Sequence, residues 1–176
     1  EPFRPAYERA IYLVRDPRDV ALSYYHHQLR QELFFGSLED FLGRFRAGRV
    51  DGFGDWASHV RSWIHRSPGE RRLLVVRYED LKGDAGTELQ RIMDFVGLPA
   101  SPGQVEAALK ANTLERMQEK EQAATVLKVK RTDIPVVRSG GTRQWEDELP
   151  PGQLAEFDAW SGDLLGELGY PRGSGA

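Results

Sequence analysis

Three residues near the start of the chain are spaced so that they could bind a phosphate group. Arg15 follows the apolar run at residues 10–14, and Asp16 is expected to be the N-cap of a helix. A helix N-terminus attracts anions, and the arginine fork matches the geometry of phosphate. Ser23 lies about two helical turns after Asp16 and so returns to the same face. The pattern predicts a phosphate site, with an Arg15–Asp19 ion pair and Ser23 as a small packing residue as the alternative.

A second candidate site is the basic segment at residues 128–143. A single acidic residue, Asp133, stands there against five cations: Lys128, Lys130, Arg131, Arg138 and Arg143. Arg138 is followed by Ser139, Gly140 and Gly141, and glycines let backbone N–H groups approach an anion closely. The segment therefore indicates a second anion contact, with a solvated basic loop that turns at its glycines as the alternative.

Composition excludes several classes of function. The chain has 176 residues, of which 40% are apolar and 29% charged, which is typical of one globular domain. Its net charge of -3 argues against a nucleic-acid partner. There is no cysteine, and the four histidines do not form a ligand pattern, so we expect no metal site. No apolar run is long enough for a membrane span and no signal peptide is visible, so we expect a cytoplasmic protein without a membrane partner.

The strands and helices expected around these residues alternate in the way that is typical of an α/β fold. Two short apolar runs, residues 10–14 and 73–77, predict buried parallel strands with helices between them. Ligands of such sheets bind at the carboxyl ends of the strands, which is where Arg15 lies. Six further segments are expected to be helical: one beginning with Pro17, 37–45 with Ser37 as N-cap, 54–66, one starting in a Thr87/Gln90 capping box and ending at Gly97, one starting in a Ser101/Gln104 capping box, and one starting near Asn112 or Thr113. Residues 124–144 are expected to form a loop, and one last helix to run from about residue 150 to Gly169.

Four segments, in this order along the chain, resemble the sulfotransferases that use 3′-phosphoadenosine 5′-phosphosulfate as sulfuryl donor. They are IYLVRDPRDVALSYYH at 11–26, GDWASHVRSWI at 54–64, RYEDLKGDAGTELQRIMDFVGLP at 77–99 and VRSGGTRQWEDEL at 137–149. The resemblance covers nearly the whole chain. It implies one sulfotransferase-like domain over residues 1–176, with an α/β fold of the P-loop NTPase type: a three-layer arrangement in which helices flank a parallel sheet.

The same resemblance assigns donor-binding residues. Arg15 and Ser23 match the pair that holds the 3′-phosphate, and Arg138 matches the arginine of a loop over that phosphate, with the backbone N–H groups of Ser139 and Gly140 beside it. Three residues match positions around the adenine: Tyr78, Thr113 and Leu114. Ser139 stands where the family usually has lysine, and Leu114 where it usually has phenylalanine, so one cation and one stacking ring are lost.

Two expected motifs of the family do not occur in this sequence. One is the Pro-Lys-Ser/Thr-Gly-Thr loop that cradles the 5′-phosphosulfate, and the other is a Lys-Thr/Ser-His segment whose histidine is the catalytic base. The resemblance therefore implies the C-terminal portion of a domain, truncated at its N-terminus, with no catalytic residue and no activity of its own. The family's C-terminal dimer motif is also absent, so no oligomeric state is predicted.

The implied function of the complete enzyme is transfer of a sulfuryl group to the hydroxyl or amine of a small-molecule acceptor. The DPRD form and the arginine-rich composition favour a bacterial source. Three alternatives stay open: a non-catalytic module that binds adenosine 3′,5′-bisphosphate (PAP), a P-loop kinase or nucleotidase relative, and a polyanion-binding protein that uses residues 128–143.

Overall fold

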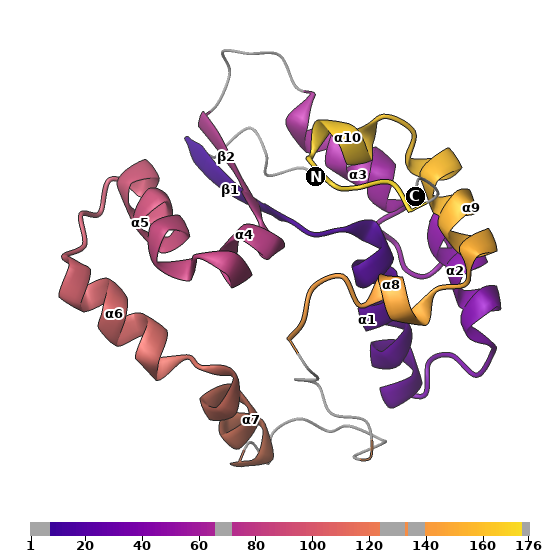
Figure 1. Ribbon diagram of the computed structural model, residues 1–176, viewed down its shortest axis with the longest axis horizontal. Coiled ribbons are helices and arrows are strands. Elements are labelled where there is room, and N and C mark those ends of the chain that lie inside the picture. The colour runs from indigo at the N-terminus through magenta and orange to yellow at the C-terminus, as the bar shows by residue number, and fades with distance from the viewer. Residues whose placement is uncertain (1–7, 66–71, 124–132, 134–139, 174–176) are drawn as a thin grey trace. The chain divides into compact units, whose positions relative to one another are not determined.

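A computed structural model of the chain describes residues 8–65, 72–123, 133 and 140–173 (Figure 1). Its contacts divide the chain into two compact units, each of which is described by itself. The sheet unit comprises Glu1–Arg15 and Ser62–Thr125, and the helical unit comprises Asp16–Arg61 and Val126–Ala176.

The sheet unit is built on two parallel strands, as the sequence predicts. Strand β1 (Arg9–Val14) pairs with β2 (Arg72–Arg77), and the register places Val14 opposite Arg77. The prediction that both strands are fully buried is wrong: Leu73, Leu74 and Val75 of β2 are only half-buried, and β1 is more exposed still. Val14 is buried, but Ile11 and Leu13 keep 43% and 55% of their surface exposed. A parallel strand is buried on both sides only where both faces of its sheet are covered, and the described residues do not cover this side of β1.

Four described helices follow β2 in the sheet unit: α4 (Tyr78–Gly83), α5 (Ala85–Val96), α6 (Pro102–Ala111) and α7 (Leu114–Ala123). Helix α5 lies against the strands, where Arg91 donates a hydrogen bond to the carbonyl of Val75 at 3.1 Å. The Arg9 guanidinium donates to the carbonyl of Phe95 at 2.6 Å. These two contacts hold α5 on the sheet.

The start of α5 corrects one prediction. Asp84, and not Thr87, is the N-cap, because its carboxylate accepts hydrogen bonds from the backbone N–H of Thr87 at 3.0 Å and from its hydroxyl at 2.7 Å. An aspartate is at least as good an N-cap as a threonine, so the helix begins earlier. Gln90 instead donates to Asp94 within the helix. The Ser101 capping box at α6 and the left-handed Gly97 that ends α5 are confirmed.

The helical unit contains α1 (Pro17–Arg30), α2 (Leu38–Arg46), most of α3 (Trp56–Ile64), α8 (Trp145–Glu148), α9 (Pro151–Ser161) and α10 (Leu164–Glu167). The predicted N-caps of α1 and α2 are confirmed. The single last helix is wrong, because the chain turns at Gly162, whose φ is 58°, and resumes as α10. Helix α8 was not predicted, and at one turn it is too short to show a periodicity.

The core of the helical unit is largely aromatic. It consists of buried apolar side chains from α1, α2, α8, α9 and the connections between them: Ala21, Leu22, Phe34, Phe41, Leu42, Phe45, Trp145, Leu149 and Phe157. Phe34 and Phe41 meet edge to face, with ring centroids 5.3 Å apart, a geometry that adds to the burial of both rings. Figure 1 shows α8 beside α1, and the N–H of Arg143, just before α8, donates to Asp19 in the first turn of α1.

Candidate functional site

Arg15 and Tyr78 meet at the carboxyl edge of the two strands. Because Val14 lies opposite Arg77, the next residue of each strand emerges at the same edge. The guanidinium carbon of Arg15 lies 4.4 Å from the centre of the Tyr78 ring, a cation–π contact. Both side chains are half-buried. The sheet unit thus places two of the predicted site residues side by side where an open parallel sheet binds its ligands.

Asp16 is the N-cap of α1, and a neighbouring arginine balances the charge of its carboxylate. Asp16 accepts a hydrogen bond from the backbone N–H of Arg18 at 2.9 Å, and Pro17 occupies the first helical position, as predicted. The Arg18 side chain also binds this carboxylate, with Nε–Oδ1 at 2.9 Å and Nη2–Oδ2 at 2.6 Å. Asp16 and Arg18 are 3% and 0% exposed. Because Arg18 balances the charge of Asp16, the cap does not cancel the attraction of the helix N-terminus for an anion.

Arg18 is a structural residue that sequence reasoning missed. Its guanidinium lies 3.5 Å from the ring centre of Trp145, and its Nη2 donates to the carbonyl of Pro171 at 2.7 Å. These contacts tie the start of α1 to α8 and to the segment after α10. The only signal in the sequence was that Arg18 and Trp145 both fall within segments used for the family resemblance.

Ser23 lies on α1 with its side chain exposed, so its hydroxyl is accessible to a ligand. Arg15 belongs to the sheet unit and Ser23 to the helical unit. That both hold one phosphate remains a prediction.

The glycine loop is described only from Gly140 onward. Its predicted anion-binding residues Arg138 and Ser139 lie outside the described residues, as do Lys128, Lys130 and Arg131 of the basic segment. Gly140 has a φ of 59°, a left-handed conformation that suits glycine, and Arg143 also has a positive φ of 60°. The carbonyl of Gly141 accepts a hydrogen bond from the Gln144 side chain at 3.1 Å. The described part is therefore an ordered turn leading into α8.

Asp19 connects this turn to α1. One oxygen of its carboxylate accepts from the backbone N–H of Arg143 at 2.9 Å, and the other from that of Trp145 at 3.2 Å. Asp19 is 1% exposed. Its role is not among the predicted ones, since the sequence only suggested a possible ion pair with Arg15.

Thr113 and Leu114 lie at the start of α7, where a helix start was expected. The Thr113 carbonyl accepts from the N–H of Met117 at 2.9 Å, and its hydroxyl faces the N–H of Arg116 at 3.4 Å. The backbone N–H of Glu115 and, after it, the Thr113 hydroxyl lower the pKa of the Glu115 carboxyl. Leu114 is half-buried. Thr113 thus has a helix-capping role in the structure, and the place of both residues beside an adenine remains a prediction.

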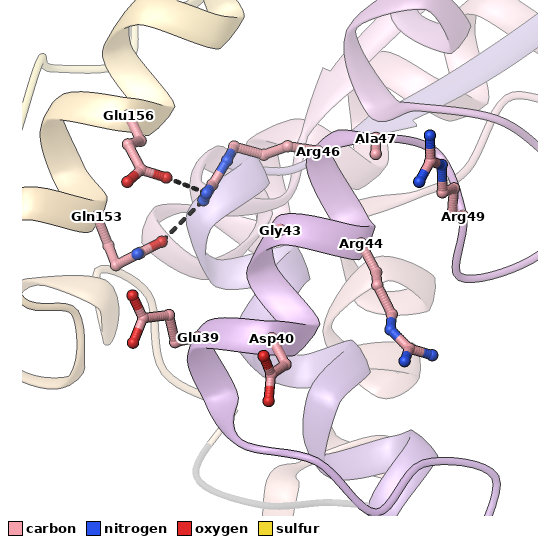
Figure 2. Close-up of a pocket in the computed structure, with 9 residues that line it drawn as sticks. All are labelled: Glu39, Asp40, Gly43, Arg44, Arg46, Ala47, Arg49, Gln153 and Glu156. Atoms are coloured by element: carbon pink, nitrogen blue, oxygen red, sulfur yellow. Dashed lines mark hydrogen bonds and ion pairs between the residues drawn. The ribbon is translucent and has the colours of Figure 1, made fainter.

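A hollow of about 370 Å³ lies between α2 and α9 in the helical unit (Figure 2). Arg46 crosses it, binding the Gln153 amide oxygen at 2.9 Å and pairing with Glu156. Its lining carries as many acidic as basic side chains: Glu39, Asp40 and Glu156 against Arg44, Arg46 and Arg49. Such a balanced lining has no net attraction for a nucleotide phosphate, and no predicted donor-site residue lines it.

The sequence matches a known family over most of its length. Residues 7–169 match the model of the sulfotransferase domain. The chain belongs to the sulfotransferase domain family. It is 31% identical over 172 residues to mouse sulfotransferase 2A6, covering 94% of this chain and 58% of that protein, and 30% identical over 170 residues to rat sulfotransferase 2A1, with the same shares covered. The chain thus spans a little more than half the length of these relatives.

Solved structures of retinol dehydratase share the fold of this chain. Retinol dehydratase in complex with retinol and PAP is 25% identical and matches with a TM-score of 0.80, covering 97% of this chain and 52% of that one. The same protein with androsterone and the inactive cofactor PAP gives a TM-score of 0.77 at 25% identity, covering 93% and 49%. The expected α/β fold is therefore confirmed.

Proposed function

We propose that this sulfotransferase-domain chain binds the 3′-phosphate and the adenine of 3′-phosphoadenosine 5′-phosphosulfate, as the donor-binding part of a sulfotransferase. The observation that carries the proposal is the contact of Arg15 with Tyr78 at the carboxyl edge of the two strands. A fixed cation and an aromatic ring on one edge suit a ligand that joins a phosphate to a flat base. The PAP in the retinol dehydratase complexes supports the same class of ligand.

Three features, each taken within its own unit, support the proposed contact with the 3′-phosphate. Arg15 supplies a charge, Ser23 supplies an exposed hydroxyl, and the start of α1 supplies a helix N-terminus whose acidic cap is neutralised by Arg18. We propose that Arg138 and the N–H groups of Ser139 and Gly140 complete this contact, and that Thr113 and Leu114 flank the base. No catalytic residue is assigned to the chain.

In the reaction we propose, the bond between sulfur and the bridging phosphate oxygen breaks as a bond forms from an acceptor oxygen or nitrogen to sulfur. The acceptor proton passes to a base, and PAP leaves with the bridging oxygen. The residues of this chain hold and orient the donor, which contributes through positioning and not through proton transfer. We propose a small-molecule acceptor; the related complexes contain retinol or androsterone.

An assay of labelled sulfuryl transfer from the donor to phenols, alcohols and sugars tests whether this chain binds the donor without catalysing the transfer. We expect this chain to bind PAP in calorimetry and to transfer no label. We expect transfer by a protein in which the 5′-phosphosulfate loop and the catalytic histidine precede the same residues. Binding without transfer in that protein would favour the non-catalytic module. Transfer by this chain alone would contradict the role given to the missing motifs.

We further propose a single domain over the whole chain, a cytoplasmic location and a bacterial source. In the described part of the chain, no helix is both long and apolar enough to cross a membrane. The relatives named above come from mouse and rat, so the bacterial source rests on the sequence alone. The net charge of -3 supports the absence of a nucleic-acid partner.

A further inference from the structure

We propose that Asp19 is the positioning residue of the 3′-phosphate site: it fixes the loop around Gly140 against α1, next to Ser23. This inference rests on the proposed function. All the residues on which it is argued belong to the helical unit.

The first argument is the use of both carboxylate oxygens. Oδ2 accepts from the N–H of Arg143 and Oδ1 from the N–H of Trp145, at 2.9 and 3.2 Å. A carboxylate can accept at both oxygens, whereas an amide of the same shape offers one acceptor and one donor. A buried negative charge also costs free energy unless hydrogen bonds compensate it. The carboxylate of Asp19, at 1% exposure, therefore accepts from both backbone donors, whereas the amide of asparagine could accept from only one of them.

The second argument is the backbone of the loop. Arg143 has a φ of 60°, which non-glycine residues rarely adopt and which persists where the surroundings hold it. Asp19 accepts from the N–H of this strained residue. The Gln144 side chain then closes the turn on the carbonyl of Gly141. The position of Gly140 and Gly141 is therefore set from their C-terminal side by a contact with α1.

The third argument is the location of Asp19 on its helix. Ser23 follows four residues later, so the two side chains lie one turn apart on the same face of α1. A loop whose Arg143 N–H is bound at Asp19 is therefore held one helical turn from Ser23, whose side chain is exposed. The N–H group of Gly140 and the hydroxyl of Ser23 would then share one rigid support, which is the arrangement that a precise binding site requires.

The test compares two buried aspartates of the helical unit. Asp19→Asn removes one acceptor at the loop. Asp158→Asn makes the same change at 9% exposure, where the carboxylate accepts from the N–H of Gly173 and is not part of the loop. Calorimetry with PAP and with adenosine 5′-monophosphate, which lacks the 3′-phosphate, isolates the contribution of that phosphate. We expect Asp19→Asn to weaken PAP binding about ten-fold or more, with the monophosphate unaffected, and Asp158→Asn to change neither.

Two results would overturn the inference: an unchanged PAP affinity in Asp19→Asn, and an equal loss of affinity for both nucleotides. If the unaltered chain does not prefer PAP to the monophosphate, the proposed function itself fails, and the inference with it. If Asp19→Asn does not fold, amide hydrogen exchange of the unaltered chain decides. PAP, but not the monophosphate, should slow exchange at Arg143 and Trp145 together with Gly140, and protection of Gly140 alone would contradict the coupling.

Discussion

Replacing Arg18 by methionine should lower the free energy of unfolding of the helical unit far more than an ordinary surface substitution does. The Arg18 guanidinium is fully buried, binds the Asp16 carboxylate through two hydrogen bonds and lies over the Trp145 ring. Methionine has a similar length and keeps an apolar contact with the ring. The main loss is therefore the cation that balances a carboxylate only 3% exposed.

Removing one partner of a buried ion pair costs about 3–5 kcal/mol. We expect the lower end, about 3 kcal/mol, because Asp16 keeps its hydrogen bond from the backbone N–H of residue 18. The Pro171 residue is exposed, so water can replace the lost bond to its carbonyl. Asp16→Ser should cost a similar amount by leaving Arg18 without its carboxylate. The double variant removes both charges while serine still caps the helix, and it should cost only about 1 kcal/mol.

Urea unfolding followed by tryptophan fluorescence measures these differences. Trp56, Trp145 and Trp160 belong to the helical unit and Trp63 to the sheet unit, so the signal reports mainly on the helical unit. The reasoning predicts that the double variant is more stable than either single variant. A loss below about 1 kcal/mol for Arg18→Met, or a double variant as unstable as the sum of the singles, would refute it.

Three further changes test other parts of the account. Arg15→Ala should weaken PAP binding about ten-fold or more in calorimetry, because a charge-assisted contact to phosphate is lost, and an unchanged affinity would remove Arg15 from the site. Glu32 follows the C-cap of α1 with a φ of 52°, a left-handed conformation that suits glycine, so Glu32→Gly should raise stability by about 1 kcal/mol in thermal unfolding. Gly97→Ala, at a φ of 77°, should lower stability. Destabilisation by Glu32→Gly would count against the strain argument. The Thr87 N–H and hydroxyl lower the pKa of Asp84, so the α5 cap stabilises the fold above the unfolded-state pKa and this stabilisation is lost as the pH falls through the lowered value. Asp84→Ala should thus be less stable than the unaltered chain in urea at pH 7, and this gap should narrow towards pH 2; a gap independent of pH would contradict the assignment.

The regular elements of the fold could be predicted where the sequence carries a long enough pattern. The strands were visible as apolar runs, and the caps of α2 and α6 as Ser37 and Ser101 followed by an acceptor three residues later. Helices α4 and α8 are too short for a periodic pattern, and Asp84 competed with Thr87 for the same cap. The exposure of Ile11 depends on what covers the sheet, which a local apolar pattern does not encode.

The candidate site also contains residues that the sequence could predict and residues that it could not. Arg15 could be named because it follows a predicted strand, whereas Tyr78 was named only through the family resemblance; the parallel register brings both to one edge. Arg18 and Asp19 could not, because charged residues are usually exposed and a local pattern gives no reason to bury them. Their partners, Trp145 and Arg143, are more than a hundred residues away in the chain, so the tertiary fold alone brings them together.

The central claim is that the chain carries the 3′-phosphate half of a donor site, and the affinity of the unaltered chain for two nucleotides tests it most directly. PAP and adenosine 5′-monophosphate differ only in the 3′-phosphate, so the ratio of their dissociation constants measures what that phosphate contributes. One charge-assisted contact predicts a ratio of about ten or more in favour of PAP at fixed ionic strength. Equal affinities, or binding of neither nucleotide, would contradict the account.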